Sequence, residues 1–184
     1  NSLWLVNLRE GERTKLMDCV HALCSRPVFS PDGNEIVYEY LNYPDGRNIL
    51  VSPRWMNLRT GENKPLFKTM NFPGSAPRWS PDGAWLSYSA AGGLRLYNTQ
   101  TGENRLVRSL YSYGAEWSPG GAAILYLDAV IKDDGQVVAQ ALVYSLASGA
   151  ARNISPDTDH EILFAAWSPD GKTLYVSNEE DGEL

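Results

Sequence analysis

Few residues in this sequence have the types and spacing that catalysis needs. Serine and aspartate recur together in Ser-Pro-Asp-Gly segments, but a serine nucleophile also needs a base, and only His21 and His160 are available. No Gly-x-Ser-x-Gly segment marks a nucleophile elbow, and no glycine-rich loop of the phosphate-binding kind occurs. The sequence therefore predicts a protein that is not an enzyme and that binds no cofactor.

The two cysteines, Cys19 and Cys24, are separated by four residues. A zinc site would need more soft ligands than this pair, His21 and the distant His160 supply. A local disulfide is the favoured interpretation, and it would indicate an oxidising compartment such as the periplasm or the cell surface. Two unpaired thiols remain the alternative, because sequence distance does not fix the geometry that a disulfide demands.

Acidic residues give the remaining candidate for metal binding. Asp157, Asp159 and Glu161 alternate in one segment, and their carboxylates are the hard oxygen ligands that calcium prefers. The EF-hand pattern is absent, so a solvated acidic loop is favoured and no metal site is predicted. Asp133, Asp134 and Gly135 form the pattern of a hairpin turn.

Charge and hydropathy exclude two classes of partner. The 184 residues carry 16 Lys and Arg against 22 Asp and Glu, for a net charge of −6. Without a basic surface to neutralise phosphates, no nucleic-acid partner is expected. No apolar run approaches the roughly 20 residues that cross a bilayer, so this segment is not expected to insert into a membrane.

Internal repeats dominate the chain. One turn occurs four times, each time after an aromatic residue, with spacings of 50, 38 and 50 residues. Such spacings are near the length of a four-stranded propeller blade. The copies are Ser30-Pro31-Asp32-Gly33, Ser80-Pro81-Asp82-Gly83, Ser118-Pro119-Gly120-Gly121 and Ser168-Pro169-Asp170-Gly171.

Short apolar strands surround these turns, and a second glycine turn follows at Gly11, Gly61, Gly102 and Gly149. The unit is four antiparallel strands, here called a, b, c and d in chain order, with the Ser-Pro-Asp-Gly turn between a and b. The predicted fold class is therefore all-β, a β-propeller of four-stranded antiparallel blades in one domain over 1–184. The expected blades are 25–67, 76–107, 114–154, and 163–184 completed by 3–16.

This pattern resembles a known family. An aromatic residue with Ser-Pro-Asp-Gly and an apolar strand, followed by Thr60-Gly61-Glu62 or Thr101-Gly102-Glu103, is similar to the TolB-type propeller repeat, which is related in architecture to WD-type repeats. The resemblance covers essentially the whole chain but does not extend to the separate domain that precedes the propeller in TolB itself. It implies a propeller fold. It leaves function open, because similar blades occur in surface proteins and in the non-catalytic domains of prolyl-oligopeptidase-like serine peptidases.

The ends of the chain fall at matching phases of the repeat. Strands a and b from 163–177 could pair with strands c and d from 3–16 to complete one blade, which would close a four-bladed ring and remove two raw sheet edges. The competing interpretation is a segment of a longer propeller, since the family it resembles more often has six or more blades.

Loop variation marks the candidate site. The a–b and c–d turns are nearly uniform. The b–c loops and d–a connections lie at the opposite ends of the strands and vary greatly. We call the face that these b–c loops and d–a connections form the loop-rich face. Variable loops on a uniform scaffold are where binding residues concentrate. The candidate partner-binding residues there are Tyr43, Met70, Phe72, Arg78, Tyr111, Tyr113, Glu116 and His160. The alternative is that the aromatic residues simply cover the ends of blades, and that Arg78 and Glu116 form a structural ion pair.

Two functions are carried forward. The first is a scaffold that binds a protein partner through its loop-rich face, in an extracytoplasmic assembly or as a subunit of a larger complex. The second is the gating propeller of a serine peptidase whose catalytic domain lies outside this sequence.

The aromatic residues that precede three of the repeated turns are expected in the core, between successive blades. They are Trp79, Trp117 and Trp167.

Overall fold

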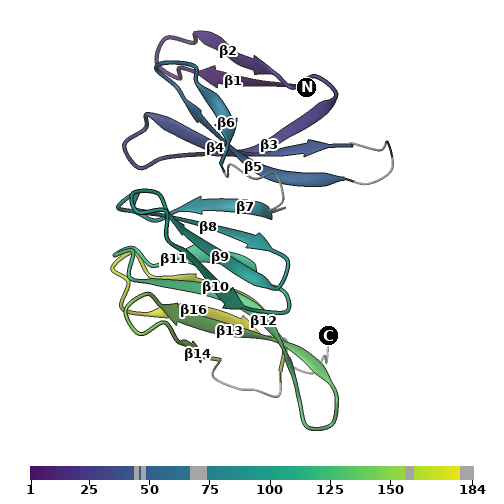
Figure 1. The fold of residues 1–184 in the computed structure, drawn as a ribbon. Coiled ribbons are helices and arrows are strands. Elements are labelled where there is room, and N and C mark those ends of the chain that lie inside the picture. The colour runs from purple at the N-terminus through teal and green to yellow at the C-terminus, as the bar shows by residue number, and fades with distance from the viewer. Residues whose placement is uncertain (44–45, 47–48, 67–73, 156–159, 179–184) are drawn as a thin grey trace, which may run out of the picture. The chain divides into compact units, whose positions relative to one another are not determined.

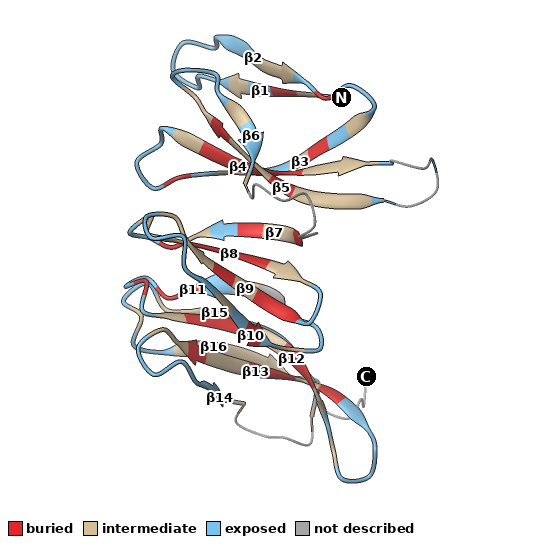
Figure 2. Cartoon of the chain, in the orientation of Figure 1, coloured by how far each residue is buried: buried red, intermediate tan, exposed pale blue. Residues whose placement is uncertain are grey.

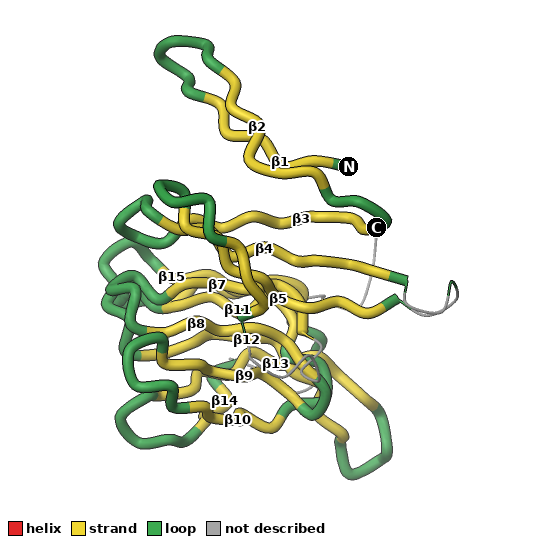
Figure 3. The backbone as a smooth tube through the Cα atoms, turned by 45° about the horizontal axis from the view of Figure 1, so that its top comes forward, coloured by secondary structure: helices red, strands yellow, loops and turns green. Residues whose placement is uncertain are grey.

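A computed structural model describes residues 1–43, 46, 49–66, 74–155 and 160–178. Within these ranges every regular element is a β-strand, and the chain is all-β as expected (Figure 3). The same ranges hold no helix that is long and apolar enough to cross a bilayer. The chain divides into two compact units, Asn1–Pro77 and Arg78–Leu184, which are described separately as unit 1 and unit 2.

Unit 1 contains two antiparallel sheets (Figure 1). The first pairs β1 (Ser2–Val6) with β2 (Arg13–Asp18). The second has the order β3-β4-β5-β6 and consists of β3 (Ala22–Phe29), β4 (Glu35–Asn42), β5 (Leu50–Asn57) and β6 (Asn63–Pro65). Leu3 from β1 packs with Ile36, Tyr38 and Met56 from the second sheet in one buried cluster.

Unit 2 begins inside β7 (Gly74–Trp79), which is the first strand of the chain's second four-stranded sheet, and it contains all of a third four-stranded sheet. The sheet that begins with β7 continues with β8 (Trp85–Ala90), β9 (Gly93–Asn98) and β10 (Asn104–Arg108). The third consists of β11 (Tyr113–Trp117), β12 (Ala123–Ile131), β13 (Val137–Ser145) and β14 (Ala151–Asn153). A two-stranded sheet of β15 (Ile162–Trp167) and β16 (Leu174–Asn178) follows.

The repeated turns have one geometry. In all four copies the glycine N–H donates to the serine carbonyl at 2.8–2.9 Å, and the glycine φ lies between 69° and 72°. The serine hydroxyl accepts the N–H of the residue five positions later at 2.9–3.1 Å. A positive φ is the conformation that glycine adopts without a steric cost, so the geometry explains the sequence motif.

Tryptophans link successive sheets of unit 2. Trp117 is buried in a cluster with Leu94, Leu96 and Tyr126, and its indole Nε1 donates to the Arg78 carbonyl at 3.3 Å. Trp167 repeats this contact one sheet later, packing against the cluster around Leu125 and donating to the Glu116 carbonyl at 3.4 Å. Trp117 therefore occupies the expected core position, whereas Trp167 is half-buried at the margin of its cluster and Trp79 is also half-buried. Buried positions recur along β8, β9 and β12 of this unit (Figure 2).

The cysteines form the expected disulfide, with a sulfur separation of 2.04 Å between Cys19 and Cys24. Both side chains are buried, and they lie at the connection from β2 to β3. Asn1 holds this connection from two sides: its carbonyl accepts the Cys19 N–H at 2.8 Å, and its side-chain Oδ1 accepts the Cys24 N–H at 2.9 Å. The number of blades, their bounds and the pairing of 163–177 with 3–16 stay predictions.

Candidate binding surface

The predicted site residues occupy different kinds of position. Tyr43 follows β4 in unit 1 and is exposed, and in unit 2 the side chains of Arg78, Tyr111 and Glu116 are exposed. His160 is half-buried, and its carbonyl accepts a hydrogen bond from Gln140 Nε2 at 3.1 Å. Tyr113 begins β11 opposite Leu127, while Met70 and Phe72 lie outside the described residues. A shared binding role for the eight stays a prediction.

A long hairpin organises the loop-rich end of unit 2. Strands β12 and β13 pair continuously from Ala123 with Ser145 to Ile131 with Val137, but β11 reaches only Leu127 and β14 only Leu142. Residues 128–140 therefore project past the rest of the sheet as a two-stranded ribbon (Figure 1). Its tip is the expected turn, closed by a 2.9 Å hydrogen bond from the Gly135 N–H to the Lys132 carbonyl.

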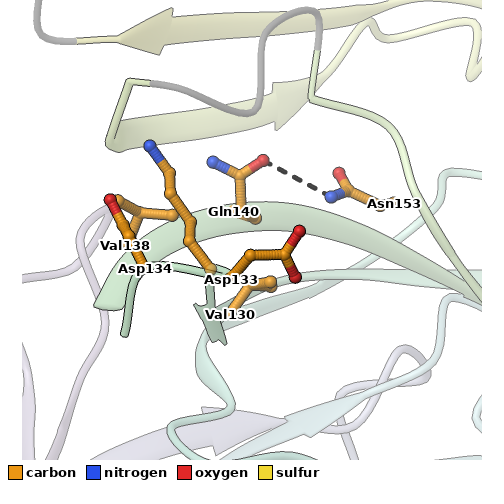
Figure 4. Close-up of a pocket in the computed structure, with 7 residues that line it drawn as sticks. Val130, Asp133, Asp134, Val138, Gln140 and Asn153 are labelled. Carbon is orange, nitrogen blue, oxygen red and sulfur yellow. Dashed lines mark hydrogen bonds between the residues drawn. The ribbon is translucent and has the colours of Figure 1, made fainter. Parts of the chain in front are cut away.

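Two cavities of similar size adjoin this ribbon, and residues that alternate along its strands line one or the other, except that Asp128 and Ala129 both line the second. One, the polar cavity, has a volume of about 410 Å³ (Figure 4). Its lining is Val130, Lys132, Asp133, Asp134, Val138, Gln140 and Asn153. The other, the apolar cavity, has a volume of about 430 Å³. Its lining is Tyr111, Leu127, Asp128, Ala129, Val137, Ala139, Glu161, Ile162 and Leu163.

A fully buried amide, that of Gln140, belongs to the lining of the polar cavity. Gln140 Nε2 donates to the Ala139 carbonyl at 3.3 Å and to the His160 carbonyl at 3.1 Å, and its Oε1 accepts from Asn153 Nδ2 at 3.4 Å (Figure 4). These bonds use both groups of the Gln140 amide, so they join the ribbon to the connection that precedes β15. We assign Gln140 a structural role.

Asp128 fixes the connection that carries Tyr111. Its Oδ1 accepts the N–H groups of Leu110 at 2.8 Å, Tyr111 at 3.0 Å and Ala129 at 2.9 Å. The same connection is tied at Ser112, whose N–H donates to Ser109 Oγ at 2.6 Å and whose carbonyl accepts from the Ser89 hydroxyl at 3.0 Å. The backbone of residues 109–112 is therefore held in place while Leu110 and Tyr111 stay exposed.

Exposed apolar side chains concentrate at this end. Six of the eight large apolar side chains that are exposed among the described residues of unit 2 belong to the ribbon, to the connection 109–112 or to the start of β15. They are Leu110, Tyr111, Ile131, Val137, Leu163 and Phe164. Exposed apolar side chains gathered near one end of a sheet are typical of an interaction site.

The charge of the apolar cavity is negative. Among the described residues that line it, Asp128 and Glu161 are charged, and none is Lys, Arg or His. Burial, and then the charge of Asp128, raises the pKa of the neighbouring Tyr126 to about 12. A ligand that fits here combines apolar surface with positive charge.

Unit 1 contains a buried carboxylate that the sequence did not single out. Glu39 accepts the Ser25 hydroxyl at 3.0 Å and the Ala76 N–H at 2.6 Å, and it lies 3.6 Å from Arg26 Nη1. Arg26 and Ala76 have positive φ angles of 49° and 52°, which cost non-glycine residues free energy. Glu39 compensates for this by binding both segments, and its oxygens are occupied by protein groups.

Among the described residues no three His, Cys, Asp or Glu side chains are grouped as metal ligands. Asp157 and Asp159 of the acidic loop lie outside the described residues, and Glu161 borders the apolar cavity.

Comparisons by sequence find no matching family model and no matching curated protein. Comparison by structure finds an oligogalacturonate lyase in complex with manganese, with a TM-score of 0.75 and 13% identity over 97% of this chain and 54% of that one. The dipeptidyl peptidase 4 of Porphyromonas gingivalis has a TM-score of 0.72 and 14% identity, over 96% of this chain and 33% of that one. A putative TolB from Agrobacterium tumefaciens has a TM-score of 0.60 and 17% identity, over 97% of this chain and 66% of that one.

This chain thus spans about half of the lyase and a third of the peptidase. Identities this low show the fold alone. The repeats, the four-stranded antiparallel sheets and these neighbours agree on one fold, the β-propeller, with TolB-like proteins among its structural neighbours.

Proposed function

We propose that this chain is a non-enzymatic β-propeller scaffold that binds a protein partner through its loop-rich face. The observation that supports it best is the fixed connection 109–112, where Asp128 holds the backbone and leaves Leu110 and Tyr111 in solvent beside the apolar cavity. Apolar side chains presented on an ordered backbone lose little conformational entropy on binding.

The proposed location is outside the cytoplasm, as part of an envelope or surface assembly. The Cys19–Cys24 disulfide supports it, because disulfides persist in oxidising compartments.

Site-specific photo-cross-linking in an envelope extract tests this function. A photoreactive phenylalanine analogue at Tyr111 is compared with the same analogue at Gln100, which is exposed in the c–d turn at the other end of the sheet. We expect a defined cross-linked species from position 111 and none from position 100. Equal labelling from both positions, or none from 111, would contradict a binding role for the loop-rich face.

A second candidate is the gating propeller of a prolyl-oligopeptidase-like serine peptidase. It is favoured by structural similarity to the Porphyromonas gingivalis dipeptidyl peptidase 4 and to a prolyl endopeptidase, the latter with a TM-score of 0.63. The coding sequence downstream of Leu184 distinguishes the two. An α/β-hydrolase segment with Gly-x-Ser-x-Gly would favour the peptidase, and a stop codon or further blades would count against it.

A further inference from the structure

We infer that the apolar cavity at the base of the β12–β13 ribbon binds a peptide segment in which an apolar side chain is flanked by Lys or Arg. This inference rests on the proposed function and names the chemistry of the partner at that face.

The cavity has the size and lining of an anchor site. Its volume of about 430 Å³ lies within the roughly 300–1,000 Å³ of typical ligand pockets. Ala129 and Ala139 face each other across the ribbon, and their small side chains leave the space that Leu127, Val137 and Ile162 surround. Burial of one large apolar side chain there would remove water from both surfaces.

The charged groups of the cavity determine which peptide residues can lie next to the buried apolar side chain, here called the anchor. Glu161 is exposed at the edge of the cavity, and Asp128 is a second, buried carboxylate in its lining. The hydrogen bonds described for Asp128 all end on Oδ1, so they use one of its two oxygens. A peptide with acidic flanks would meet like charges, whereas a basic residue beside the anchor can pair with Glu161.

The ordered surroundings favour a defined peptide over non-specific adhesion. Asp128 joins the connection 109–112 to the ribbon, and Gln140 joins the ribbon to the segment before β15. Three segments distant in sequence thus form one rim, which includes Tyr111, Val137 and Leu163.

Synthetic peptides test the inference directly. The probe is a heptapeptide with the sequence Gly-Ser-Arg-Phe-Arg-Ser-Gly, and the two controls replace both Arg by Glu or replace Phe by Ser. Binding is followed by two-dimensional amide NMR of the whole chain and by fluorescence anisotropy. We expect the probe alone to bind, with a dissociation constant below about 1 mM, to shift the amides of Ala129, Ala139 and Leu163, and to weaken as salt is raised.

Matched variants localise the effect. Glu161→Gln should weaken binding of the probe by about threefold, the size of an exposed ion pair, whereas Asp133→Asn changes charge equally but lines the polar cavity and should have no effect. Ala139→Phe should abolish binding by filling the space. If that variant does not fold, the comparison of Glu161→Gln with Asp133→Asn still tests whether the probe binds at the apolar cavity.

Other outcomes of the peptide experiment would contradict specific parts of the inference. Equal binding of the Glu-flanked peptide would overturn the charge selection, and shifts confined to residues outside the cavity would overturn the site. If the probe fails to bind at about 1 mM while the cross-link from position 111 persists, this inference is wrong and the proposed function stands. Loss of the cross-link would remove the proposed function instead.

Discussion

At the scale of single residues, the repeats differ in whether a buried tyrosine has a partner. The Tyr38 hydroxyl donates to Asn63 Oδ1 at 3.0 Å. Tyr126 occupies the equivalent place in the third four-stranded sheet, but Ala151 stands where the asparagine would be. Asn63 pairs with Met56, which pairs with Ile36, two residues before Tyr38, and Ala151 is related to Tyr126 in the same way through Tyr144 and Ile124. The Tyr126 hydroxyl is buried and has no hydrogen-bond partner among the described residues.

Replacing Ala151 by Asn should therefore stabilise the chain. A new acceptor for the Tyr126 hydroxyl is expected to raise the free energy of unfolding by about 1 kcal/mol, the net worth of one hydrogen bond. Urea denaturation measures the change. As a control, Tyr126→Phe should cost little in the natural chain but should cancel the gain in the Ala151→Asn background, and an equal effect in both backgrounds would contradict the pairing.

The third turn gives a pH-dependent prediction. Hydrogen bonds from the serine hydroxyls lower the pKa values of Asp32, Asp82 and Asp170 below 3.8, but Gly120 replaces the aspartate in the third copy. No atom lies within 4 Å of the position of a Cβ at Gly120. Gly120→Asp and Gly120→Ala should both stabilise by roughly 0.5 kcal/mol by restricting the unfolded chain.

At neutral pH the Gly120→Asp variant should be more stable than the Gly120→Ala variant, because the carboxylate of the new aspartate accepts a hydrogen bond from the Ser118 hydroxyl. A lowered folded-state pKa gives stability that is present above the unfolded value and lost as pH falls through the folded value. The difference between the variants should therefore shrink below about pH 4. Thermal unfolding at pH 7 and pH 3 measures it, and a difference that does not change with pH would exclude the charged hydrogen bond.

At the scale of elements, the disulfide joins a two-stranded sheet to a four-stranded one. Cys19 follows β2 and Cys24 lies in β3, so the bond supports the turn through which β1 and β2 are attached. Changing both cysteines to Ala should lower the free energy of unfolding by roughly 2 kcal/mol on the chain-entropy model. Amide hydrogen exchange should accelerate more in β1 and β2 than in β4 and β5.

Alkylation provides the independent measurement. Intact-mass analysis should find no free thiol before reduction and two after it. If both thiols of the aerobically purified chain react without reduction, both the disulfide and the location outside the cytoplasm lose their support.

The elements that the sequence predicts best are those fixed by local chemistry. The turns at Gly33 and Gly83 and the turn at Gly135 follow from residues within a few positions of one another. The cysteine pair is similarly local. The role of Asp128 could not be predicted, because it depends on N–H groups 17 and 18 residues away that only the folded connection brings to it. Glu39 and Ala76 were missed for the same reason.

At the scale of the whole molecule, two interpretations differ in what covers β16. If 163–177 pair with 3–16, then β16 gains a neighbour on the side away from β15, and its outward N–H groups are protected. We expect alternate amides of Leu174–Asn178 and of Ser2–Val6 to exchange slowly in a chain that light scattering shows to be monomeric. The outer edge of β2 serves as the unprotected reference. Fast exchange along β16 would instead favour a segment of a longer propeller.

The projecting ribbon lies apart from the strands that complete its sheet, and it carries part of the proposed binding surface. Beyond Asp128 and Gln140 it contributes its own ladder and turn, while the sheet beneath is completed by β11 and β14. Changes of length or sequence at residues 132–136 should therefore be tolerated as insertions in an exposed loop are. Under the proposed function, related chains can change their partner through the ribbon while they keep the strands beneath it.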